Sequence, residues 1–194
     1  MKQNYLYILV LLYTLNVIPA HAQSYVESML TYKVTVHYSD YNVVAHVEPV
    51  EKISLSSDRT YFWFGGNQIH TTQGGYSGKL LNGTYEELYP EKSLKESGNF
   101  KEGLKTGIWK NWTKEGILIE EFHFHKGRKQ GPYVRFDKLG KMAEKGIYKD
   151  DQLEGKQEKV VADSTVTVYY KSGKVVQRKS IFPKFIHKIF PKKP

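Results

Sequence analysis

The chain has no cysteine among its 194 residues. This absence excludes disulfide bonds, zinc sites built on thiolates, a cysteine nucleophile and an N-terminal lipid-modified cysteine. Acidic residues are fewer than basic ones: the chain has 20 Asp and Glu and 29 Lys and Arg, which gives a formal net charge of +9. A fold without disulfides must be held by its apolar core, and the 15 Tyr and 9 Phe supply side chains that suit a β-sheet.

Long apolar runs are also lacking outside residues 1–22, which have the three-part layout of a secretory signal peptide. Lys2 lies near the start, an apolar run extends from about Leu6 to Ile18, and a small-x-small cleavage site ends at Ala22. The run is shorter than the about 20 residues that a membrane-spanning helix needs. We therefore predict cleavage after Ala22 and an extracytoplasmic protein, periplasmic or secreted. An uncleaved membrane anchor is the alternative.

Positive charge is concentrated in residues 180–194, where no acidic residue occurs. Apolar residues there follow a helical spacing between two prolines, which predicts a short amphipathic helix or tail. This tail either caps the last repeat or lies on an anionic membrane surface. The rest of the chain mixes both signs of charge, so no nucleic-acid partner is expected. The lysines that would face the membrane are Lys184, Lys188, Lys192 and Lys193.

The dominant feature of the sequence is a repeat of 24 residues. Glycine recurs at this step, and an aromatic residue follows each of the first three glycines by two positions. A fixed period of this size is typical of stacked units that cannot bury their apolar faces alone. The glycines are Gly83, Gly107, Gly131 and Gly155, and the aromatic residues are Tyr85, Trp109 and Tyr133.

Each unit reads as two short strands and two turns. In one unit, residues 107–112 form a strand, 113–116 a hairpin turn, 117–124 the return strand and 126–131 the link to the next unit. Antiparallel hairpins repeated in this way predict an all-β fold, an elongated meander of 24-residue hairpins.

The repeat array is expected over residues 59–179, with a degenerate first unit near Thr60. Its last unit is irregular, and an insertion of nine residues around 156–164 accounts for the late position of Gly173. Upstream, residues 23–58 contain two strand-like segments separated by turn residues. They predict a β-hairpin that caps the array, as terminal units of solenoids commonly do.

These units resemble the MORN-repeat variant family, whose units read G-x-aromatic-x-x-G-x-x-x-G-x-aromatic-x-x-aromatic-x-x-x-G. Residues 98–116 match throughout, whereas Phe122 replaces the first glycine of the next unit and Asp151 replaces the second glycine of the one after. The resemblance covers about residues 59–179 and implies a binding scaffold. Many bacterial members of this family are identified as antitoxins of toxin–antitoxin systems. Other arrays of MORN type are associated with membranes or act as assembly scaffolds.

One strand carries a candidate metal site. Glu121, His123 and His125 alternate, so their side chains are expected on one face, opposite Phe122 and Phe124. Two imidazoles and a carboxylate can hold zinc with an open fourth position. The trio occurs in one unit only, so a solvated strand face is the competing interpretation, and no cofactor is expected.

Glutamates recur in register at Glu96, Glu120 and Glu144. Like charges directly opposite each other destabilise a sheet, so neighbouring lysines are expected to pair with them. A structural role at the edge is therefore favoured over carboxylate catalysis, which needs two carboxylates across a cleft.

Aromatic side chains are the candidates for an interaction surface. Those of the array form either the core or an exposed platform for a sugar ring or a peptide. In residues 61–64, strand alternation sends two large rings to each face, so at least one pair needs cover from the N-terminal region or from a partner. The candidates are Tyr61, Phe62, Trp63, Phe64, Tyr85, Trp109, Trp112, Tyr133 and Phe136.

Together these features favour an exported, non-enzymatic repeat scaffold that mediates protein–protein or envelope-surface interaction. The alternative is an antitoxin-like protein that binds and neutralises a toxin partner, which requires retention in the cytoplasm. The third hypothesis is a metal-dependent hydrolase that uses Glu121, His123 and His125.

Overall fold

The structure, a computed structural model, describes residues 32–48, 53–162 and 164–177. The predicted signal peptide and the predicted C-terminal tail lie outside these residues. The strands are β1 (Tyr32–His37), β2 (Asn42–Val47), β3 (Thr60–Gly65), β4 (Gln68–Gln73), β5 (Lys79–Leu88), β6 (Leu94–Lys101), β7 (Leu104–Trp112), β8 (Leu118–His125), β9 (Arg128–Phe136), β10 (Met142–Lys149), β11 (Gln152–Val161), β12 (Ser164–Lys171) and β13 (Lys174–Val175). Within the described ranges, no helix is long and apolar enough to cross a membrane.

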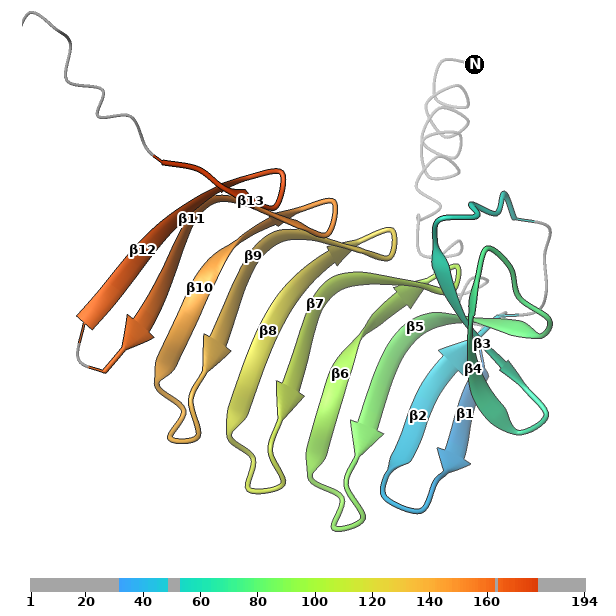
Figure 1. Cartoon of the computed structure of the whole chain (residues 1–194). Coiled ribbons are helices and arrows are strands. Elements are labelled where there is room, and N and C mark those ends of the chain that lie inside the picture. The colour runs from blue at the N-terminus through green and yellow to red at the C-terminus, as the bar shows by residue number, and fades with distance from the viewer. Residues whose placement is uncertain (1–31, 49–52, 163, 178–194) are drawn as a thin grey trace, which may run out of the picture.

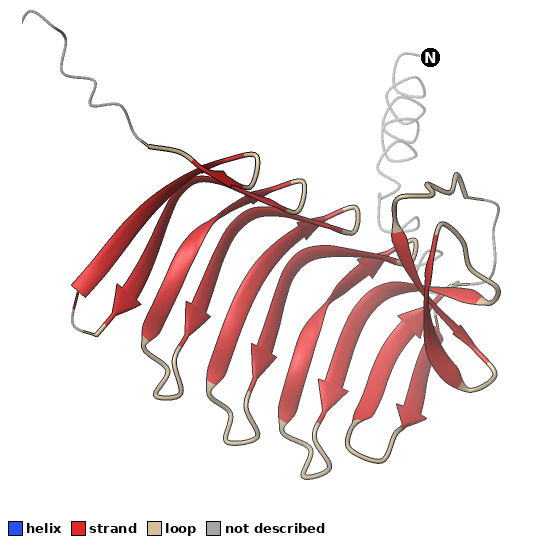
Figure 2. Cartoon of the chain, in the orientation of Figure 1, coloured by secondary structure: helices blue, strands red, loops and turns tan. Residues whose placement is uncertain are grey.

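The strands form one antiparallel sheet in the order β1-β2-β5-β6-β7-β8-β9-β10-β11-β12-β13. Consecutive hairpins lie side by side, and the sheet does not close into a barrel (Figure 1). The hairpin of β3 and β4 leaves this order, joins the sheet through a short pairing of β3 with β5, and crosses the N-terminal end (Figure 2). The predicted all-β meander of hairpins is therefore confirmed.

Two kinds of turn alternate along the array and lie on its opposite sides (Figure 1). Longer turns join β5 to β6, β7 to β8 and β9 to β10. Two-residue turns join β6 to β7, β8 to β9, β10 to β11 and β12 to β13, and both residues of each have the positive φ that is typical of type I′ turns. We call these four turns the turn ridge: Glu102–Gly103, Lys126–Gly127, Asp150–Asp151 and Ser172–Gly173.

The turn ridge links each unit to the preceding one. The second residue of every ridge turn donates its backbone N–H to a carbonyl in the strand one unit back. These bonds satisfy the turn amides and hold successive hairpins in a fixed register. They run from Gly103 to Leu81 (2.8 Å), Gly127 to Lys105 (2.9 Å), Asp151 to Lys129 (3.1 Å) and Gly173 to Leu153 (2.9 Å).

The same bonds show that the predicted insertion of nine residues around 156–164 is wrong. Gly173 belongs to the fourth ridge turn, and Val161 pairs with Ser164, so a two-residue connection replaces the longer turn of the other units. The last unit is thus shorter than the others. The prediction was wrong because it aligned Gly173 with Gly116 and Gly140 of the longer turns, whereas Gly173 lies in a two-residue turn.

The repeated glycines lie inside strands. The prediction that residues 126–131 form a link is therefore wrong for residues 128–131, which belong to β9. The φ angles of the repeated glycines are positive, for example 68° at Gly107 and 114° at Gly131. In β9, three residues around Gly131 stand opposite His123 alone, because the register shifts between Phe122 and Phe124. Such a bulge bends its strand, and glycine adopts the left-handed conformation without steric cost. The long strands accordingly curve in the same sense (Figure 1).

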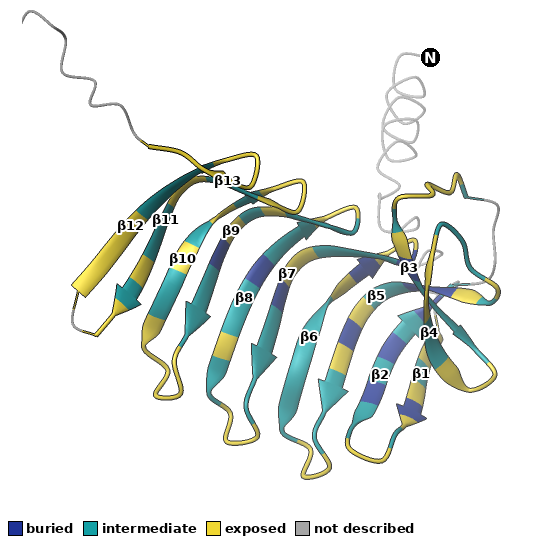
Figure 3. Cartoon of the chain, in the orientation of Figure 1, coloured by how far each residue is buried: buried dark blue, intermediate teal, exposed yellow. Residues whose placement is uncertain are grey.

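Aromatic side chains of the bent strands form the core. Tyr85, Phe100, Trp109, Phe122 and Tyr133 are each at most 6% exposed. The ring centroids of Phe100 and Trp109 are 4.9 Å apart, and those of Phe122 and Tyr133 are 5.4 Å apart. Burial decreases along the array, and none of the described residues of β10 to β13 is fully buried (Figure 3).

Gly98 lies against the indole ring of Trp109. A Cβ atom added at Gly98 would lie 2.3 Å from the Trp109 ring, so only glycine leaves room for the indole. The indole Nε1 donates to the carbonyls of Asn99 and Thr106, each at 3.2 Å. These contacts fix the ring against the neighbouring strand.

The N-terminal end is closed by two hairpins. The hairpin predicted within residues 23–58 is present as β1 and β2, and it extends the sheet because β2 pairs with β5. The expectation of a degenerate unit near Thr60 is wrong, since β3 and β4 lie outside the strand order. Their Phe62 and Phe64 instead pack against the core beneath them. The reason is that apolar β2, with Ala45 opposite Tyr85, already occupies the edge of the first unit.

Gly107→Ala is expected to destabilise the chain by about 1–2 kcal/mol, because an L-residue is strained at its positive φ. Gly75→Ala is the matched control. A Cβ at either position meets nothing within 4 Å, but Gly75 has no positive φ. Urea unfolding of both variants measures the difference, and equal free energies of unfolding would refute the assigned role of the bulge.

Stability is expected to fall as the pH rises above 10. Burial raises the pKa of Tyr85 and Tyr133 above the ordinary value of 10.0, with further contributions from Glu87 and Glu144. The unfolded tyrosines ionise near pH 10 and the folded ones do not, so their contribution is complete below pH 10 and is lost above it. Tyr85→Phe should flatten this alkaline loss in unfolding measured from pH 9 to 11. The same change at the exposed Tyr32 should not.

Candidate functional site at the turn ridge

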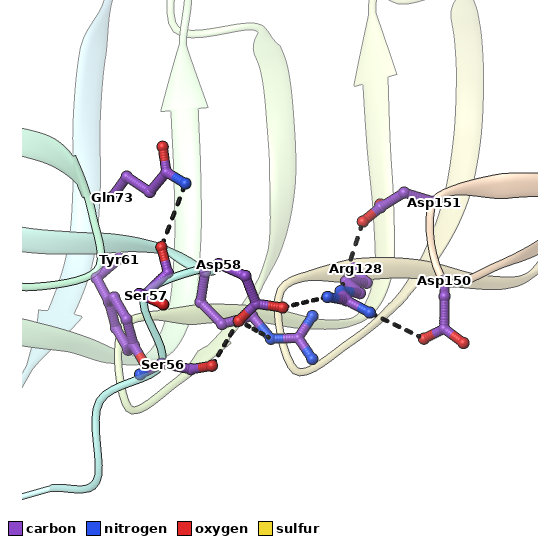
Figure 4. Close-up of polar contacts among 9 residues, drawn as sticks. Ser56, Ser57, Asp58, Tyr61, Gln73, Arg128, Asp150 and Asp151 are labelled. Carbon is purple, nitrogen blue, oxygen red and sulfur yellow. Dashed lines mark hydrogen bonds and ion pairs between the residues drawn. The ribbon is translucent and has the colours of Figure 1, made fainter.

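Residues 53–59, which precede β3, lie against the turn ridge. The backbone N–H of Phe62, just after this loop, donates to the carbonyl of Gly103 at 2.8 Å. Asp58 forms an ion pair with Arg128, the first residue of β9 (Figure 4). Arg128 also faces the third ridge turn, at 3.6 Å from Asp150 and 3.9 Å from Asp151. One guanidinium therefore connects the loop to two successive units.

Further hydrogen bonds hold the loop on its other side (Figure 4). The hydroxyl of Ser56 donates to Asp58, and the Ser56 backbone N–H donates to the Tyr61 hydroxyl at 3.0 Å. The Ser56 hydrogen bond, together with the charges of Arg59 and Arg128, lowers the pKa of Asp58. Asp58 therefore remains ionised and serves several donors at once.

Two cavities adjoin this loop. We call the first the basic cavity; it has a volume of about 510 Å³ and is lined by Arg59, Lys101, His125 and Lys126, with Glu102 as its carboxylate. The second, the mixed cavity, has a volume of about 550 Å³. Its wall combines acids and bases, namely Asp58, Asp150, Asp151, Glu154, Arg128, Lys149 and Lys171.

Arg59 is the unusual residue of the basic cavity. Its Nε lies 3.8 Å from Asp58, but its Nη1 is buried and has no hydrogen-bond partner among the described residues. Buried donors in folded proteins nearly always have an acceptor, so an orphaned guanidinium nitrogen requires an explanation. The neighbouring Asp58 does not supply it, because its carboxylate also serves Ser56 and Arg128.

The side chains of the predicted metal site do not converge in the structure. Glu121 lies 3.8 Å from His123 but pairs with Lys110 at 3.1 Å. His125 lies past the register shift, where it lines the basic cavity. In the described ranges, no three His, Asp or Glu side chains form a group that could hold a metal ion. The carboxylate of Glu121 is therefore engaged by a lysine, and His125 lies at the end of β8 beside the basic cavity.

The glutamates at the repeat step are paired with cations, one with the expected lysine and two with an arginine. Glu96 accepts from Lys105 at 2.8 Å, while Arg135 lies 3.4 Å from Glu120 and 3.6 Å from Glu144. Lys105 also lies over the Trp109 ring, with its Nζ 3.7 Å from the centroid. These cations relieve repulsion between the carboxylates and cover the aromatic core.

Of the predicted interaction aromatics, four are core residues with at most 6% exposure: Tyr61, Tyr85, Trp109 and Tyr133. Trp112 and Phe136 are half-buried near the longer turns. Cover for residues 61–64 comes from the chain itself. Phe62 and Phe64 pack on the core, and Trp63 stacks on His70 with ring centroids 4.3 Å apart.

Sequence reasoning missed Arg59, Asp58 and Arg128. Arg59 stands one repeat step before Gly83, where the repeat has glycine, and Asp58 and Arg128 are 70 positions apart. No local pattern indicates that they meet. Their contact depends on the path of the loop over the turn ridge.

The sequence matches no protein-family model, and comparisons with curated proteins and with solved structures find no significant match. The fold by itself defines an open β-hairpin repeat protein with a cross-laid hairpin at its N-terminal end.

Asp58→Asn is expected to loosen residues 56–62, because the loop loses its ion pair with Arg128. Amide hydrogen exchange in these residues should become faster, above all at Phe62. The Asp58 contribution is present above its unfolded pKa and is lost as pH falls through the lowered folded pKa, so the wild-type loop should also loosen in acid. Asp150→Asn removes a carboxylate from Arg128 but not from the loop. Equal exchange in both variants would contradict this tether.

Proposed function

We propose that the chain is an exported, non-enzymatic repeat scaffold that binds a protein partner or the envelope surface. The observation that carries this proposal is the repeated bond between each ridge turn and the preceding unit. It places equivalent surface positions at regular intervals on one sheet. Such a surface favours several weak contacts made together over one deep site.

The turn ridge is the part of this surface that we assign to the partner. The aromatic face is occupied by the chain's own core and by ion pairs such as Lys105–Glu96. The ridge instead presents exposed side chains from its turns, except at the buried Gly103 and the half-buried Gly127, and both charged cavities open beside it. Polar groups of this kind suit the polar rim of a protein interface.

The sequence outside the described residues supports the envelope as the location. Residues 1–22 have the layout of a signal peptide, and the lysines within 180–194 suit an anionic membrane surface. The antitoxin-like alternative differs in one respect that can be measured, since it requires the intact chain in the cytoplasm.

The test combines location with contact. Cells producing the native chain, with a photo-crosslinking residue at Lys149 beside the ridge, are fractionated, and the mature N-terminus is read by mass spectrometry. We expect a chain beginning at Gln23 outside the cytoplasm and a crosslinked partner. The same residue at Lys138, in the longer turn between β9 and β10, should give no crosslink.

An Ala22→Lys variant controls for cleavage, because a large charged residue blocks a small-x-small site. An intact Met1 in the cytosol of wild-type cells would overturn the proposed export and favour the antitoxin-like alternative. Equal crosslinking from Lys149 and Lys138 would overturn the assignment to the turn ridge.

A further inference from the structure

We propose that the basic cavity binds a phosphate monoester. The cavity lies between the loop of residues 53–59 and the first two ridge turns, and its wall includes Arg59, Lys101 and Lys126. This proposal does not depend on export or on the scaffold function.

Charge is the first argument. Three permanent cations and the single carboxylate of Glu102 give the lining residues a net charge of +2 with His125 counted as neutral, and the nearby Asp58 offsets part of the Arg59 charge. Within the described ranges, neither Lys101 nor Lys126 forms an ion pair. A phosphate monoester carries a charge of about −1.5 to −2 at pH 7 and three strong acceptor oxygens, so it balances this excess.

Arg59 is the second argument. Its guanidinium is held in the wall with one nitrogen buried and unpartnered, although its planar fork is suited to two oxygens of one anion. We expect the guanidinium to rotate when an oxyanion binds, so that the anion provides the acceptor that the buried Nη1 lacks. The hydroxyls of Ser54 and Thr106 lie in the same wall and can donate to the remaining oxygens.

The size of the cavity indicates more than an inorganic ion. A volume of about 510 Å³ lies within the range of small-molecule sites. Leu104 adds apolar surface to an otherwise polar wall. The ligand therefore consists of a phosphate group on a small organic body, such as a glycerol or a sugar.

The backbone that carries the three cations of the basic cavity belongs to the sheet and to the loop packed on it. Lys101 ends β6 and Lys126 begins the second ridge turn, so they come from two adjacent hairpins of one sheet, while Arg59 comes from the loop above them. A ligand that contacts all three would tie the loop to the array, as Arg128 already does on the other side of Asp58.

The test is a titration followed by amide resonances of the full-length protein. The probes are inorganic phosphate, sn-glycerol 3-phosphate and vesicles that contain phosphatidic acid, whose headgroup is also a phosphate monoester. We expect saturable shifts at Arg59, Glu102 and Lys126, with tighter binding of sn-glycerol 3-phosphate than of inorganic phosphate.

The variant Lys101→Met/Lys126→Asn removes two cations from the wall. Asn suits the positive φ of residue 126, so the turn is kept. Loss of two charged hydrogen bonds should weaken binding by at least about tenfold. The control Lys149→Met/Lys171→Met makes the same change of charge in the mixed cavity and should leave binding unchanged. Arg59→Lys, which keeps the charge but loses the fork, should also weaken it.

A response to the soluble probes without a response to the vesicles assigns a soluble ligand, and a response to the vesicles as well assigns a lipid headgroup. Both results support the site if the Lys101/Lys126 variant abolishes them. Absence of a saturable response to all three probes would overturn the proposal. So would equal weakening in the two double variants, because binding would then reflect only the overall charge of the chain.

Discussion

A sheet of one layer can bury large rings only if its strands bend around them. In this protein the bend occurs at bulges that contain the repeated glycines, such as Gly107 and Gly131, whose φ is positive. Trp109 and Tyr133 then become almost fully buried without a second layer. The same bend brings the two-residue turns over the preceding unit, where their amides find acceptors. The core, the register and the ridge all depend on this backbone conformation.

The ridge in turn positions the charged groups that have no role in the core. A loop before β3 follows it and contributes Asp58 and Arg59, while the array contributes Arg128, Lys101 and Lys126. Charges that would be unremarkable on separate strands are thereby gathered around two cavities. Because the ridge is held by backbone bonds, these cavities have a fixed frame, which is a requirement for selective binding.

Much of the array could be predicted from its sequence. A step of 24 residues identified the hairpins, whereas the choice between core and exposed platform for Trp109 was decided by its burial in the structure. The pairing of the repeated glutamates followed from electrostatics alone. Errors arose where two turn types share the same residues. Gly173 satisfies either turn, and only its bond to Leu153 decides between them.

The sequence by itself determined that this protein is an all-β array, because a fixed period of glycines and aromatics permits only stacked units of one kind. Tertiary structure decided where the ends of the array lie and which charges meet. β2 took the place at the edge of the first unit, and the β3–β4 hairpin was left to cover the core. The tertiary structure also placed Asp58 beside Arg128. The reason is physical: local periodicity encodes local pairing, whereas a contact between distant residues depends on how the whole chain turns.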